Sequence, residues 1–318
     1  MSEKLTDAEF AARWGLWRHF LCHGNDHNAI HQQLTDIYWN IGIYRVELAT
    51  WGYGKVDIPS VPRLFFHHYL HTFSIYLAAS IRKITDKGQL FNKKDGKEPD
   101  RSVISLWSIG KDMLALNQEY NRKRLFQVQG LQYDVQALER KHQAYVEKMT
   151  KSGINRSWVS PKESPEPSRR LHKIWDTLSE TRMEDRKEYD SIPGSRLEAI
   201  LTEITLVKGE IDILTNKFYL HAATPESRAS DPRYDEETYI GPSINRLIEL
   251  SLQCGRIYYK LCDLLLTEVY PLPVYEGDKW DGWKSNQYVN RDELEKIWKQ
   301  WNEEIKAAIQ LREPLLEN

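Results

Sequence analysis

The sequence predicts an all-α protein, a helical bundle that carries a charged helical insertion. Apolar residues recur at steps of three and four along most of the chain, helix-capping patterns stand near both ends, and no convincing alternating run indicates a strand. Besides a helix near each end, we predict helices over residues 28–50, 62–85, 102–118, 122–150, 168–189, 195–221 and 243–270.

The first and last helices are predicted from capping boxes. Thr6 is followed three residues later by Glu9, and Asn290 by Glu293, each just before an apolar-periodic run. The glycines of "GYG" at 52–54 end the helix predicted at 28–50, and the next helix begins at a proline.

The clearest change in composition is "SPKESPEPSRR" at 160–170, whose three prolines do not fit inside one helix. Residues 121–151 before it hold seven Lys and Arg against three Asp and Glu. We therefore predict a single domain over 1–318, in which 119–170 is a charged helical insertion with a proline-rich linker. The basic run is either a nucleic-acid patch or, as the favoured interpretation, a solvated helix face.

Composition limits the classes of function. Lys and Arg total 44 against 46 Asp and Glu, so the formal charge is −2 and only a local patch could attract a polyanion. Three cysteines are too few for a disulfide scaffold, and Cys254 and Cys262 lie about 12 Å apart if helical, which is beyond disulfide reach. These features predict a cytoplasmic protein.

One segment has the length of a membrane span. Residues 64–81, "LFFHHYLHTFSIYLAASI", carry no formal charge, but they include three histidines together with Ser and Thr, which are costly in lipid. We predict a buried helix of the bundle and no membrane partner. The start "MSEKLTDAEF" has no basic region followed by an apolar run, so we expect no secretory signal.

The helix predicted at 195–221 has the most regular apolar seam and ends in a histidine. Its seam positions are Leu197, Ile200, Ile204, Val207, Ile211, Leu214 and Phe218. His221 is the next position in that alternation, and Lys217 shares its face. Periodicity alone favours a histidine at the core edge, held by a carbonyl or by the helix C-terminus.

Two stretches resemble the HEPN superfamily (higher eukaryotes and prokaryotes nucleotide-binding), in its abortive-infection, AbiU-like branch. The first is "FFHHYLHTFSIYLAASIRKITDKG" followed by "RSVISLWSI", and the second is the helix ending "NKFYLHAA". Together they cover about a third of the chain. The resemblance implies a HEPN-like bundle that pairs as a homodimer.

The resemblance also implies a metal-independent endoribonuclease with an Arg, four to six residues, His motif. His221 matches the histidine, but Leu214, Thr215 and Asn216 occupy the positions at which the arginine would stand. Asn216 matches only as a polar helix residue, and Lys217 is the candidate replacement cation. A lysine does not reproduce the forked guanidinium against phosphate.

The "RKITD" element supplies two further candidates for binding RNA. We expect Asp86 to cap or pair and Arg82 to face the groove; the alternative is a structural ion pair that ends the helix. No metal or cofactor is expected.

Two function classes remain. One is an RNA-cleaving or RNA-binding effector of a toxin–antitoxin or anti-phage system, with RNA or an antitoxin as partner. The other is a catalytically silent scaffold that binds a partner protein. His67 and His71 have the spacing of a metal pair but lie in an aromatic helix, where we expect them to pack.

Overall fold

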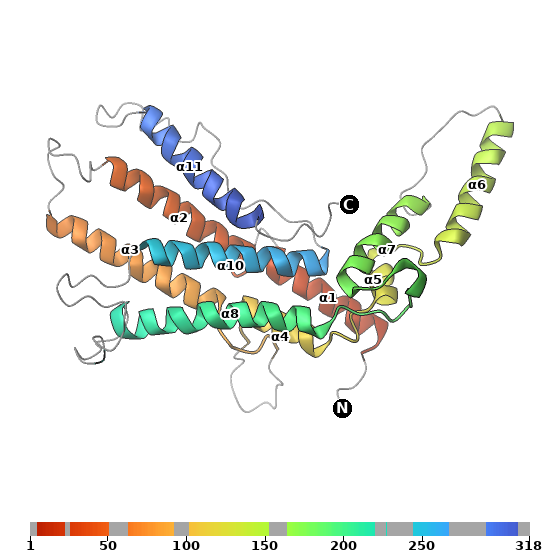
Figure 1. Ribbon diagram of the computed structural model, residues 1–318, viewed down its shortest axis with the longest axis horizontal. Helices are drawn as coiled ribbons and strands as arrows, with labels where there is room; N and C mark the ends of the chain where they lie inside the picture. Colours follow the sequence, from red (N-terminus) through yellow and green to blue (C-terminus); the bar gives the residue numbers. More distant parts are fainter. Residues whose placement is uncertain are drawn as a thin grey trace. The chain divides into compact units, whose positions relative to one another are not determined.

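The computed structural model describes residues 5–22, 26–50, 63–91, 102–152, 164–219, 227, 244–266 and 291–310. Helices dominate these ranges, which contain no β-strand and one isolated β-bridge, between Asn121 and Ser191 (Figure 1). The all-α prediction is confirmed. The chain divides into two compact units: residues 1–17, 111–199 and 314–318 form unit 1, and residues 18–110 and 200–313 form unit 2.

Unit 1 contains most of α1 (Asp7–Cys22), the end of α4 (Leu106–Ala115), α5 (Arg122–Gln129), α6 (Val135–Lys151), α7 (Pro165–Ser179), a 3₁₀ turn η1 (Met183–Asp185) and the start of α8 (Gly194–Leu214). Its core is aromatic: Trp17, Tyr120 and Trp175 are buried with ring centroids 5.1 to 6.1 Å apart. The predicted insertion at 119–170 falls within this unit.

Both capping and backbone geometry set the ends of these helices. The predicted capping box opens α1, since the Thr6 amide donates to Glu9 Oε2 at 2.8 Å and the Glu9 amide donates to Thr6 Oγ1 at 3.2 Å. The single helix predicted at 122–150 is two helices, because Gly130 ends α5 at φ 66°, a left-handed conformation that glycine adopts without steric cost.

Part of the predicted proline-rich linker at 160–170 is helical, because α7 begins at Pro165. Ser164 caps α7, and Pro165 occupies its first turn, where a missing N–H costs no helical hydrogen bond. The helix ends at Ser179 rather than near residue 189, since Glu180 takes a left-handed conformation. Residues 160–163 and the capping residue Asn290 lie outside the described ranges.

Unit 2 is organised around α10 (Ile244–Leu265), which packs against α3 (Arg63–Ile84), α2 (Ile30–Thr50) and α11 (Arg291–Gln310) (Figure 1). α10 is buried along most of its length, including Leu250, Ile257 and Leu261. In α3, Phe73, Leu77 and other apolar residues of one face are buried, so the predicted buried helix is present. Among the described residues, none of the helices has the length and apolar character needed to cross a membrane.

α8 follows the predicted seam closely. Leu197, Ile204, Ile211 and Leu214 are buried in the chain itself, as the three- and four-residue spacing predicts. Beyond Leu214 the helix continues as a π-helical segment, η2 (Thr215–Tyr219), which packs against α3.

The histidines of α3 differ from the prediction that they pack in a core. His71 is exposed, as is His68 beside it, because the buried stripe of α3 follows Phe73, Leu77 and their neighbours on another face. The side chain of His67 lies outside the described part of the chain.

Candidate functional site

The predicted catalytic residues stand where α8 changes from α- to π-helix. Asn216 is exposed and Lys217 is half-buried, both within η2. π-Helical turns are rare, and those that do occur are often found at functional sites. Thr215 is buried, and its hydroxyl donates to the Ile211 carbonyl at 2.8 Å, which anchors the start of the π turn. His221, the predicted proton-transfer group, lies outside the described residues.

Arg82, in the last turn of α3, reaches the end of α8. Its Nε lies 3.4 Å from Asp212 Oδ1, and Lys208, one turn earlier on α8, pairs with the same carboxylate. Lys217 follows Asp212 by five residues, about 7 Å along a helix axis. The structure therefore brings Arg82 to the helix end that bears Asn216 and Lys217.

Arg82 forms an ion pair, and its partner comes from another helix. The carboxylate comes from Asp212 of α8, so the pair joins two helices instead of ending α3. The side chains of Arg82 and Asp212 are 40% and 33% exposed, and such solvated pairs stabilise a fold by only about 0–1 kcal/mol. Arg82 is thus accessible to a second anion.

Asp86 acts through its backbone. The Ser105 hydroxyl donates to the Asp86 carbonyl at 2.6 Å, while the Asp86 side chain is exposed. Ser105 in turn forms a reciprocal cap with Ser108 at the start of α4, at 3.0 Å in each direction. Asp86 therefore holds the segment between α3 and α4, and the structure gives its carboxylate no described role at the α8 end.

Cations gather around the Asp212 carboxylate. Arg82 and Lys208 both pair with it, and Lys217 lies five residues further along the chain. A helix C-terminus carries a partial negative charge, which favours a cation such as Lys217 for structural reasons alone. Arg82, whose side chain is 40% exposed, can still be reached by an anion such as a phosphate.

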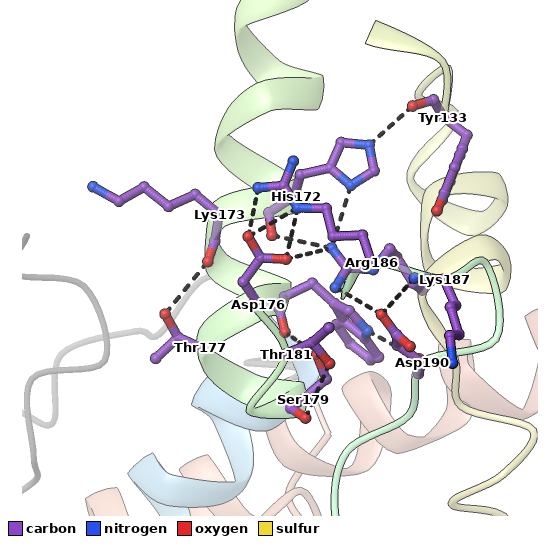
Figure 2. A network of polar contacts seen from close by, with 12 residues as sticks. Tyr133, His172, Lys173, Asp176, Thr177, Ser179, Thr181, Arg186, Lys187 and Asp190 are labelled. Carbon is purple, nitrogen blue, oxygen red and sulfur yellow. Dashed lines mark hydrogen bonds and ion pairs between the residues drawn. The ribbon is translucent and has the colours of Figure 1, made fainter. Parts of the chain in front are cut away.

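A second polar cluster lies in unit 1, around a fully buried arginine. Arg122 Nη1 lies 2.8 Å from Asp176 Oδ1, and its Nη2 lies 3.1 Å from Asp190 Oδ2. Arg186 donates from Nε to Asp176 Oδ1 at 2.9 Å, so the two carboxylates are matched by two guanidinium groups (Figure 2). This pairing of charges explains how Arg122 can be buried, since an unpaired buried charge is costly.

His172 completes the cluster as a neutral ring. Arg122 donates toward Nδ1 at 3.3 Å, and Nε2 lies 2.9 Å from the Tyr133 carbonyl, to which it donates (Figure 2). Burial lowers the pKa of His172, with the Arg122 charge acting in the same direction and the Tyr133 hydrogen bond opposing it. The ring is held by contacts on both nitrogens, so the cluster joins α5, α7 and the 186–190 segment as a structural element.

Three of the seven cations in the predicted basic run at 121–151 form ion pairs within the protein. Arg122 is buried as described, Lys123 pairs with Glu188, and Arg124 pairs with Glu119. The other four, all on α6, are Arg140, Lys141, Lys148 and Lys151, and each is exposed. A solvated helix face therefore describes this region better than a continuous basic patch.

A polar hollow of about 400 Å³ lies beside α5. Lys123 and Arg124 line it together with Asp7 and Glu119, so its charges balance. Arg124 is already held by Asp7 at 3.2 Å as well as by Glu119. The hollow therefore shows no preference for an anion.

Sequence reasoning missed the Arg122 cluster. Its members come from separate segments, with Arg122 and Asp190 separated by 68 positions. The one available signal is that His172 falls on the same helical face as Leu171 and Trp175, at a position where an apolar residue is expected.

Comparison with known proteins adds no relative: no family model, no curated protein and no solved structure matches the chain.

Proposed function

We propose that this protein is a HEPN-like, RNA-cleaving or RNA-binding effector of a toxin–antitoxin or anti-phage system, and that RNA binds where α3 ends beside the end of α8. The observation that supports this most is the Arg82–Asp212 ion pair, which places Arg82 beside the π-helical segment bearing Asn216 and Lys217. Arg82 and Lys217 are cations of the kind that contact RNA phosphates.

The proposed chemistry uses proton transfer without a metal. Cleavage needs a base for the 2′-hydroxyl proton, an acid for the leaving oxygen and positive charge near the phosphorane. In this proposal His221 transfers a proton, Lys217 and Arg82 supply positive charge, and Asn216 donates a hydrogen bond. One histidine cannot be both acid and base in one step, so the second group comes from the partner subunit of a homodimer.

The test is single-turnover cleavage of a mixed RNA pool by wild type, His221→Ala, Lys217→Ala and Arg82→Ala, with thermal melts of each. Loss of a proton-transfer group should lower the rate about a hundredfold or more. Lys123→Ala is the matched control, because this lysine, whose side chain is 40% exposed like that of Arg82, also sits in an ion pair but lies in unit 1. His221→Ala cleaving as fast as wild type would reject the assignment.

The second candidate function is a catalytically silent scaffold that binds a protein, and the outer face of α8 favours it. Opposite the buried seam, Leu206 is 70% exposed and Ile213 is 41% exposed. Large apolar side chains gathered on one exposed helix face are typical of an interaction surface. Wild-type protein inert on every RNA would favour this function.

For this surface we propose a second copy of the chain as the occupant. Gly209 lies on the same face, one turn from Leu206, and no other segment of the described residues comes within 4 Å of where its Cβ would be. In an antiparallel two-fold contact, Leu206 of each copy would fill the space over Gly209 of the other, while Thr202 would meet Ile213. Such self-complementarity is what an isologous dimer requires.

A further inference from the structure

Two cysteines from opposite ends of the sequence meet inside unit 2. Cys22 is the last residue of α1, Cys262 lies in α10, and their sulfur atoms are 3.6 Å apart. Neither is in a disulfide and both are buried, with Cys22 8% exposed and Cys262 fully covered. The Tyr258 hydroxyl lies 3.6 Å from Cys22 Sγ.

We propose that Cys22 and Cys262 form a redox-sensitive pair that closes into an intramolecular disulfide when the protein meets a peroxide. The sulfur atoms are at van der Waals contact and must approach by about 1.5 Å to reach the bonded distance of about 2.05 Å. Cys22 can make this movement because it ends its helix, where the backbone has fewer helical hydrogen bonds to break.

The reaction with hydrogen peroxide balances without another reactant. The Cys22 sulfur, the more accessible of the two, attacks one peroxide oxygen; the O–O bond breaks, Cys22 becomes a sulfenic acid and one water leaves. The Cys262 sulfur then attacks the Cys22 sulfur, the S–O bond breaks and a second water leaves. Two thiols are oxidised by two electrons, and one peroxide is reduced to two waters.

Tyr258 supports the first step. Burial raises the pKa of Tyr258, so its hydroxyl keeps its proton and can donate it in a hydrogen bond to the Cys22 sulfur. A donor beside the sulfur favours the thiolate, which is the reactive form.

Cys254 provides an internal contrast. It lies on α10 eight residues before Cys262, roughly 12 Å along the helix axis, which is too far for a disulfide with that residue. Burial raises the pKa of Cys254 to about 12, so it remains a thiol at neutral pH. Oxidation should therefore select the pair and spare this residue.

The disulfide would join the end of α1 to α10, the central helix of unit 2. It would also close a loop of more than two hundred residues, which restricts the unfolded chain and raises the melting temperature. This inference is independent of whether the protein acts on RNA.

The experiment uses the full-length chain, freed of reductant and treated with hydrogen peroxide, followed by alkylation of the remaining thiols and peptide mapping. We expect a linked Cys22–Cys262 peptide, alkylated Cys254, full reversal by dithiothreitol and a melting temperature higher by roughly 5 °C. The Cys254→Ser variant should behave as wild type. Cys262→Ser should yield no intramolecular link and should leave Cys22 open to further oxidation.

Three results would overturn the inference. They are alkylation of all three cysteines after treatment of the folded protein, links that involve Cys254 as often as the pair, and a linked protein that melts no higher than the reduced one.

Discussion

At the scale of single residues, the clearest contrast is between two neighbours on α5. Arg122 is fully buried and contacts Asp176 and Asp190, whereas Lys123 pairs with Glu188 at the surface. Both side chains are cations in ion pairs, but only the first is surrounded by protein. Their energetic roles should differ accordingly.

We predict that Arg122→Met lowers the free energy of unfolding by about 3–5 kcal/mol, because it leaves two carboxylates without their buried cation. Lys123→Met, the control, should change it little, since the surface pair is screened by water. Urea unfolding of both variants measures the difference. Equal effects of the two substitutions would show that the cluster does not hold unit 1 together.

The same cluster predicts a pH dependence. The pKa of His172 is lowered in the folded protein, so below its ordinary value of about 6.5 the unfolded chain binds the proton more readily. Stability should therefore be constant above that pH and decrease as pH falls toward the folded pKa. Arg122 and Arg186 oppose protonation, and Asp176 favours it.

Unfolding in urea at pH 7.5 and pH 5.5 tests this dependence. Wild type should lose stability between the two values, and His172→Gln should start lower but lose less. A variant whose loss equals that of wild type would assign the pH dependence to other histidines.

At the scale of elements, local chemistry decides where helices end, and close contacts decide how they pack. Gly130 and Glu180 end α5 and α7 in left-handed conformations. Gly42 acts differently: on α2 it leaves room for the Trp298 ring of α11, whose atoms would lie 2.3 Å from an added Cβ. Trp298 is buried, so it cannot simply turn into solvent.

Gly42→Ala should therefore destabilise the protein by about 1–3 kcal/mol, because the clash with the ring exceeds the gain in helix propensity. Gly15→Ala on α1 is the control: in the described part of the chain, no other segment comes within 4 Å of its added Cβ, so it should stabilise by about 0.5–1 kcal/mol. Thermal or urea unfolding reports both. A stabilised Gly42→Ala protein would contradict the described packing of α2 and α11.

At the scale of the whole molecule, α8 has one face that is buried and one that is exposed. The predicted apolar seam is buried within one chain, as at Ile204 and Ile211, and is unavailable to a partner. The exposed face with Leu206 and Ile213 is the surface that remains. Self-association, if it uses α8, must use this face.

We predict a dimer at micromolar concentration in sedimentation velocity, and a shift to monomer in Leu206→Glu, because the charge would be buried at the contact. Met183→Glu is the matched control: Met183 is 69% exposed, close to the 70% of Leu206, but lies in unit 1. A wild type that is monomeric throughout this range, or equal dissociation by both substitutions, would remove α8 as the interface.

The sequence by itself determined the helical class, the approximate place of most helices, the capping box of α1 and the buried seam of α8. These features depend on residues three or four positions apart, whose contacts are set by the helix itself. For the candidate site, the sequence placed Asn216 and Lys217 at the end of one helix. The proton-transfer role of His221 stays a prediction.

Only the tertiary structure decided which charges are matched and which thiols meet. Arg82 contacts Asp212, Arg122 contacts Asp190, and Cys22 contacts Cys262, although the partners are 68 to 240 residues apart in the sequence. The order of residues along the sequence does not identify these partners, because helix packing determines which side chains meet. The basic run of 121–151 therefore became partly a set of internal ion pairs.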